Sequence, residues 1–205
     1  WAEGSNWTCR SEPTGSDDLN IPSSPSNQPV IAANASCNNL TIQAGAMLTV
    51  NTGVTLSVSG NLTIKTNSSD HGVLLEEGTA STSVTGSTNI ERWFENDSDW
   101  HFYSPGVSGE SGDIFTGFYG KYYSESAGSW YFLQTSTSLG VMQGFSLKYD
   151  SGASSQTVTA TGSLNSGSQS ISVTNGSGSG WNLVGNPYPS TIDWDAASGW
   201  SRSNI

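Results

Sequence analysis

Short hydrophobic triplets with a polar centre recur between residues 40 and 64. They read Leu40-Thr41-Ile42, Leu48-Thr49-Val50, Leu56-Ser57-Val58 and Leu62-Thr63-Ile64. Each triplet alternates with a period of two residues, the period of a β-strand that buries one face. Turn sequences that contain glycine separate the triplets, at 44–46, 52–53 and 59–61. The pattern therefore predicts very short strands joined by tight turns.

Strands of this length need neighbours, because an isolated hairpin of three-residue strands cannot bury a face. In a β-solenoid each triplet would lie on the next and share a core of Leu, Ile and Val. Residues 73–75 and Ile90 extend the expected stack, and the Pro-rich residues 1–33 are expected to form an irregular cap. The same alternation also fits an antiparallel meander, since periodicity does not determine strand direction.

The pattern changes after about residue 92, where longer strands rich in aromatic residues are expected. They are predicted at 100–103, 121–123, 130–133, 144–149, 157–162, 170–173 and 181–184. Strands with Gly, Ser and Asn turns at this spacing are typical of a sandwich or jelly roll. The predicted fold is thus all-β, with a capped β-solenoid-like region at 1–92 and an antiparallel β-sandwich or jelly-roll domain at 93–205.

Charge removes two classes of partner from consideration. The chain has six Lys and Arg against seventeen Asp and Glu, a formal net charge of −11, so neither nucleic-acid phosphates nor an anionic membrane surface would attract it. It contains no run of eighteen apolar residues, and we expect no membrane insertion. It starts at Trp1 with neither Met nor a hydrophobic signal segment, as a processed secreted chain or an excised piece of one would.

Cys9 and Cys37 are the two cysteines. In an extracellular chain a lone pair usually forms a disulfide, here one that closes a loop around the Pro-rich stretch. The alternative is two free thiols. With no clustered histidines, the pair offers zinc too few ligands.

The stretch 95–99 is a candidate calcium site. Asn96, Asp97 and Asp99 supply the oxygen atoms that Ca²⁺ prefers, although the EF-hand pattern is absent. The alternative is an acidic linker between the two domains. No other cofactor is expected.

Aromatic residues are the remaining candidate for binding. The chain has eight Trp and seven Tyr, and Tyr119, Tyr122 and Trp130 could form a platform on which sugar rings stack. The alternative is that such residues fill the core of the sandwich. We assign no catalytic residues, since the carboxylates fall in no glycosidase pattern and the serines lack a G-x-S-x-G elbow.

Several longer motifs carry a resemblance. GWNLVGNPYPSTIDWDAASGW at 180–200, WHFYSPGV at 100–107, GFSLKYD at 144–150, TGSLNSG at 161–167 and NLTIQAGAMLTVNTGVTLSVSGNLTI at 39–64 resemble repeat segments of very large secreted proteins. Gliding, polysaccharide-degrading bacteria export those proteins by the type IX secretion system. The resemblance implies an adhesin-like or scaffold module of the cell surface, and it carries over no catalytic residue.

The resemblance also implies that the second domain continues beyond this chain in related proteins. We expect missing final strands to leave an open sheet edge, which a neighbouring subunit or surface protein would complete; the alternative is a fragment or a domain that closes alone. The expected function is a secreted structural or adhesive cell-surface component, and the open edge predicts that it is a subunit of an extracellular assembly or filament. The alternative is a carbohydrate-binding module of an exported polysaccharide-degrading enzyme, and a hydrolase is a third class.

Overall fold

The fold is all-β. A computed structural model describes residues 1–23, 25–150, 154–176, 178–196 and 198–199. Within these residues the only helices are two 3₁₀ turns, η1 (Gly4–Asn6) and η2 (Gly112–Phe115). No helix in the described part of the chain has the length and apolar character needed to cross a membrane.

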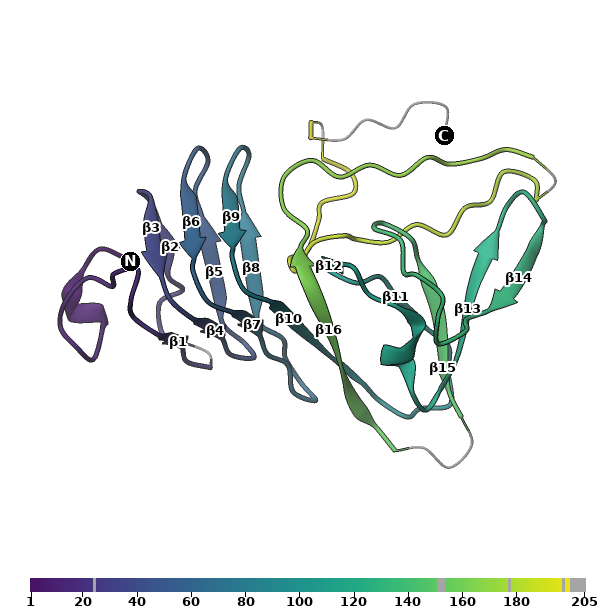
Figure 1. Cartoon of the computed structure of the whole chain (residues 1–205), viewed down its shortest axis with the longest axis horizontal. Helices are drawn as coiled ribbons and strands as arrows, with labels where there is room; N and C mark the ends of the chain where they lie inside the picture. Colours follow the sequence, from purple (N-terminus) through teal and green to yellow (C-terminus); the bar gives the residue numbers. More distant parts are fainter. Residues whose placement is uncertain (24, 151–153, 177, 197, 200–205) are drawn as a thin grey trace.

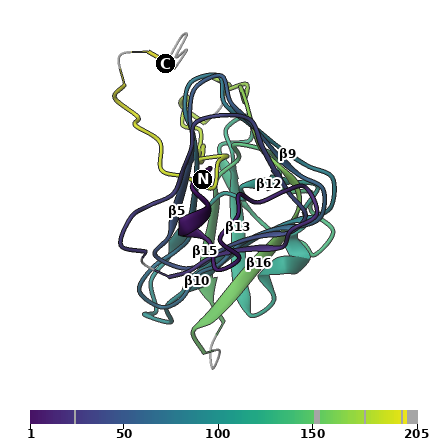
Figure 2. The ribbon, with the colours of Figure 1, turned by 90° about the vertical axis from the view of Figure 1, so that its left-hand side faces the viewer.

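The first half of the chain forms three parallel stacks of short strands (Figure 1). One stack has the order β1 (Leu19–Ile21), β4 (Leu40–Ile42), β7 (Leu62–Ile64) and β10 (Thr88–Phe94). The second has β2 (Val30–Ile31), β5 (Met47–Val50) and β8 (Val73–Glu76), and the third has β3 (Ala35–Cys37), β6 (Thr55–Val58) and β9 (Ser81–Val84). Viewed from the N-terminal end, successive turns of the chain lie over one another as a three-sided outline (Figure 2).

The four triplets are strands as predicted, but they do not stack in the predicted order. Leu40 pairs with Leu62, and Ile42 with Ile64, so a strand lies on the strand three places later and not on the next one. Consecutive triplets belong to different stacks, because the short turn between them bends the chain from one side of the three-sided outline to another. The parallel pairing also rules out the antiparallel meander for this part.

The shared core lies inside the three stacks, where every inward triplet position is apolar. Leu40, Leu48, Leu56, Leu62 and Leu74 are all at most 1% exposed. Burial of a Leu side chain contributes roughly 1.5–3 kcal/mol. A strand of three residues is therefore stable here only because its two inward side chains join a continuous column.

A ladder of side-chain amides, which begins at the Asp18 carboxylate, holds one corner of the stack. The backbone N–H of Asn39 donates to Asp18 Oδ1 at 3.1 Å, that of Asn61 to Asn39 Oδ1 at 2.8 Å, and that of Ser87 to Asn61 Oδ1 at 2.9 Å. Each turn of the chain thus satisfies a backbone donor of the next turn, which would otherwise be left unpaired at the corner.

The irregular cap is shorter than predicted. Strands β1 and β2 lie within residues 1–33, so the irregular segment before the first strand ends at residue 18. Trp1 and Trp7 pack edge to face at 5.2 Å and cover the end of the core. The sequence concealed β1 because Asn20 occupies the position that Thr or Ser holds in the other triplets.

The second half contains an antiparallel sheet of four strands in the order β11 (His101–Tyr103), β15 (Phe145–Tyr149), β13 (Phe118–Ser124) and β14 (Ser129–Phe132). The long strand β16 (Gln156–Leu164) runs antiparallel to both β10 and β12 (Val107–Ser108). It thereby extends the first stack into a six-stranded sheet of the order β1-β4-β7-β10-β16-β12. A second core, which includes Phe94, Phe115, Phe145 and Leu147, fills the space beside this sheet. Strand β10 reaches from the first core to the second, so the domain boundary expected at residue 92 falls inside a strand.

Two predicted strands are wrong. Residues 170–173 and 181–184 form no strand, and Val184 makes only an isolated bridge with Gln143. Trp181, which lies in the second of these predicted strands, is 77% exposed. Gly180 has a φ of +82°, and Pro187 and Pro189 follow soon after, so the backbone near this segment is unsuited to regular pairing.

Candidate functional site

The four-stranded sheet has one face that is not covered by the second core. Along β13, Phe118 and Tyr122 pack against the core, while Tyr119, Lys121 and Tyr123 lie on the opposite face. This follows from strand geometry, because successive side chains alternate between the two faces of a sheet. The outward side chains of β13 meet outward side chains of the neighbouring strands.

Cross-strand pairs bring large rings together on this outer face. Tyr123 lies opposite Trp130 with ring centroids 5.4 Å apart, and Lys121 lies opposite Phe132. Lys121 Nζ is 4.9 Å from the ring centroid of Phe132 and also 4.9 Å from that of Trp100. We call this surface the aromatic face; its rings belong to Trp100, Phe102, Tyr119, Tyr123, Trp130, Phe132 and Trp181.

The aromatic face is both exposed and concave. Phe102 is 69% exposed and Phe132 is 60% exposed, although burial of such side chains is strongly favourable. A hollow of about 330 Å³ is lined by Phe102, Tyr123, Trp130, Trp181, Asn182 and Leu183. Contiguous exposed apolar surface of this kind is typical of a binding site.

Of the three predicted sugar-stacking residues, the structure brings two to this surface. Tyr119 and Trp130 lie on the aromatic face. Tyr122 does not, because side chains alternate along β13 and Tyr122 falls on the same side as Phe118, toward the second core. There its ring stacks on that of Tyr131, with the ring centroids 5.6 Å apart. The prediction missed five rings of this face: Trp100, Phe102, Tyr123, Phe132 and Trp181. Strict alternation from Tyr119 and Trp130 would have selected Tyr123 and Phe132.

The predicted disulfide is absent from the structure. Both cysteines are free; Cys9 is exposed, whereas Cys37 points into the core from β3. Ser11 Oγ donates to Cys9 Sγ at 3.5 Å. One sulfur atom therefore lies at the surface and the other in the core, so the predicted disulfide between Cys9 and Cys37 does not form in this structure.

The calcium prediction finds no support in the geometry. The described residues contain no group of three or more His, Cys, Asp and Glu that could hold a metal ion. Asp97 Oδ1 instead accepts a hydrogen bond from the backbone N–H of Asp99 at 3.0 Å and lies 3.1 Å from His101 Nε2. The Asn96 backbone N–H donates to Ser155 Oγ at 2.9 Å.

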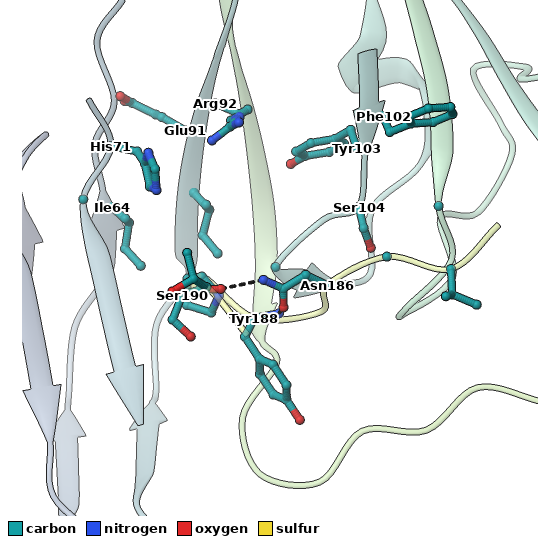
Figure 3. A pocket seen from close by; sticks show the side chains of 18 of the residues that line it. Ile64, His71, Glu91, Arg92, Phe102, Tyr103, Ser104, Asn186, Tyr188 and Ser190 are labelled. Atoms are coloured by element: carbon teal, nitrogen blue, oxygen red, sulfur yellow. Dashed lines mark hydrogen bonds between the residues drawn. The ribbon is translucent and has the colours of Figure 1, made fainter. Parts of the chain in front are cut away.

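A second cavity, of about 460 Å³, lies where the parallel stacks meet the second half of the chain. We call it the junction cavity (Figure 3). Its walls come from β10, from β11 and the residues after it, from the loop between β7 and β8, and from the segment 183–191. The segment 183–191 belongs to the GWNLVGNPYPSTIDW motif, from which Asn186 and Pro189 line the cavity.

Hydrogen bonds hold this wall in place. Asn186 donates through Nδ2 to the Ser190 carbonyl at 2.5 Å and accepts from the Tyr188 N–H at 2.9 Å. The buried Asn165 donates to the Pro187 carbonyl at 3.0 Å and to the Pro105 carbonyl at 3.4 Å. Gly185 is required, because a Cβ there would lie 2.3 Å from the Ser104 Cβ.

No curated protein and no solved structure matches the chain. The family described as "Domain of unknown function (DUF8693)" matches residues 1–204. Since the match covers almost the whole chain, the protein belongs to the DUF8693 family.

Proposed function

We propose that this protein is a secreted adhesive component of the cell surface and that it adheres to polysaccharide through the aromatic face. The observation that carries the proposal is the row of exposed rings on the outer side of β13 and β14. The C–H faces of sugar rings are apolar, and they pack on flat aromatic side chains whose edges remain in water. No such surface is needed to stabilise the sheet, whose other side covers the second core.

In this proposal the chain is a β-solenoid followed by an antiparallel sandwich. The pairing of strands three places apart supports the first part, and the core between the four-stranded sheet and β10 with β16 supports the second. The solenoid would serve as a spacer, since the aromatic face lies at the far end of the molecule from the N-terminal turns (Figure 1). The binding surface would thus stand away from whatever precedes the stack.

The proposed compartment is extracellular, with export by the type IX route. The support is the motif resemblance, together with a composition that is low in charged residues and rich in Ser, Thr, Gly and Asn. A carbohydrate-binding module of an exported polysaccharide-degrading enzyme is the second candidate, and the aromatic face supports it equally. Self-association remains a proposal as well, because β14 is an edge strand with four exposed residues.

The experiment measures binding of the chain to a panel of polysaccharides by tryptophan fluorescence and by affinity electrophoresis. Trp130→Ala should weaken binding by about tenfold, since loss of a stacked ring costs roughly 0.5–1.5 kcal/mol beyond area burial. Tyr131→Ala is the matched control: Tyr131 is 45% exposed on the same strand but turned to the other face. It should change affinity less than twofold.

An equal loss in both variants, or binding to no polysaccharide, would count against the proposal. Displaying the chain on cells and measuring attachment to the same polymer then separates the adhesive role from the enzyme-appendage role. Filaments in electron micrographs of the purified chain would favour self-association as the main partner.

A further inference from the structure

The long strand β10 connects the two hydrophobic cores, and its inward face is interrupted by a charge. Thr88 and Ile90 face the core of the parallel stacks, and Phe94 belongs to the second core. By the two-residue period of a strand, Arg92 shares this inward face. Arg92 is nevertheless exposed, because the junction cavity opens between the two cores at its position.

The positive charge of Arg92 is not neutralised by the protein. None of the ion pairs formed by the described residues includes Arg92. The adjacent Glu91 also lines the cavity, but its carboxylate pairs with Lys65 Nζ at 2.5 Å. In a chain with a net charge of −11, a guanidinium that faces a cavity without a carboxylate partner is conspicuous.

Two hydroxyl groups in the same cavity also lack protein partners. Tyr103 Oη and Ser104 Oγ are buried and form no hydrogen bond with a described residue. Figure 3 shows the Tyr103 hydroxyl pointing from β11 toward the side of the cavity that holds Arg92. A buried polar atom without a partner is costly, and native proteins rarely retain one that has no role.

The remaining walls combine apolar residues with polar ones, among them His71. Ile64, Ile90 and Pro189 supply apolar surface, and Thr191 supplies a further hydroxyl. The volume of about 460 Å³ lies within the range of small-ligand pockets, roughly 300–1,000 Å³. A ligand that fits must present hydroxyl groups, C–H surface and one negative charge.

We propose that the junction cavity binds an anionic sugar unit, with Arg92 contacting its carboxylate or sulfate and Tyr103 and Ser104 contacting its hydroxyls. A guanidinium binds such planar or tetrahedral anions through two parallel hydrogen bonds. The junction cavity is a second site, separate from the aromatic face. The proposal for the cavity does not depend on whether the aromatic face binds polysaccharide. Phe102 and Leu183 border both hollows, so a long acidic polymer reaches both.

The test is calorimetric titration of the whole chain with three oligosaccharides of equal length: an oligogalacturonate, a sulfated galactan fragment and a neutral galactan fragment. At least one anionic sugar should bind at least tenfold more tightly than the neutral one, with an affinity that falls as salt is added. The two anionic arms distinguish a carboxylate from a sulfate ligand. Binding of neither, or equal binding of the neutral sugar, overturns the proposal.

Variants then assign the binding to this cavity. Arg92→Gln should weaken anionic-sugar binding at least tenfold, whereas Lys148→Gln, which removes a cation beside the aromatic face, should not. Tyr103→Phe should also weaken binding several-fold, while it preserves or raises the melting temperature because it deletes an unpartnered hydroxyl. Unchanged binding in both cavity variants overturns the proposal, and loss of binding in Trp130→Ala alone would assign the anionic sugar to the aromatic face instead.

Discussion

Truncation of Leu62 tests whether the column of inward side chains stabilises the parallel stacks. Leu62 is 0% exposed and lies between Leu40 and Thr88 in the stack. Leu62→Ala removes about three methylene equivalents at roughly 0.8 kcal/mol each. The surrounding strands are held by their own ladders and cannot collapse fully, so a residual cavity should raise the loss to about 3–4 kcal/mol.

Urea denaturation followed by circular dichroism measures this loss. With a slope of roughly 2–3 kcal/mol per molar urea, the midpoint should fall by about 1–2 M. Thr63→Ala is the control, because Thr63 occupies the outward position of the same strand, and it should change stability by less than about 1 kcal/mol. A loss below about 1 kcal/mol for Leu62→Ala, or equal losses for both variants, would refute a tightly packed inner column.

Three further predictions concern single side chains. In the folded protein Cys9 should react with a thiol reagent and Cys37 should not, since burial, and then the nearby acidic charge of Asp18, raise the Cys37 pKa to about 11; mass spectrometry that finds neither thiol reactive would restore the disulfide. The pKa of Glu125 is lowered by hydrogen bonds from the Thr174 side chain and from three glycine N–H groups, so its stabilisation is complete above its unfolded pKa and is lost as the pH falls through the lower, folded value. Glu125→Gln should therefore lower the melting temperature at pH 7 and flatten its acid dependence, and an unchanged acid limb would contradict this. Asn165→Ala should cost about 1–3 kcal/mol and speed proteolysis after residue 165; equal cleavage rates would show that this amide does not hold the C-terminal segment.

The first half was the more predictable part because its strands repeat a local pattern. Leu40-Thr41-Ile42 and its three relatives show their inward positions directly, and each became a strand. Their partners could not be derived, since alternation identifies a face but not which strand lies beside it. The corner amides Asn39 and Asn61 were equally hidden, because a ladder appears only once the turns are in register.

The second half was less predictable because its partners are remote in sequence. The aromatic character of 130–133 and 144–149 indicated strands correctly, yet β16 pairs with β10 across the expected boundary. Trp181 suggested a buried strand by composition, but its exposure depends on the conformation of the whole C-terminal segment. The junction cavity could not be predicted from the sequence, because it forms only where the two cores meet. Only there does Arg92 lack an ion pair and the Tyr103 hydroxyl lack a hydrogen-bond partner among the described residues.

The amide ladder makes the length of the molecule adjustable. Each full turn carries its own corner acceptor and presents the same edge to the turn that follows. A turn could therefore be inserted or deleted without altering either hollow, and each would change the reach by one inter-strand spacing, about 4.8 Å. The number of turns therefore sets, in fixed increments, the distance between the N-terminal end of the stack and the second half of the chain.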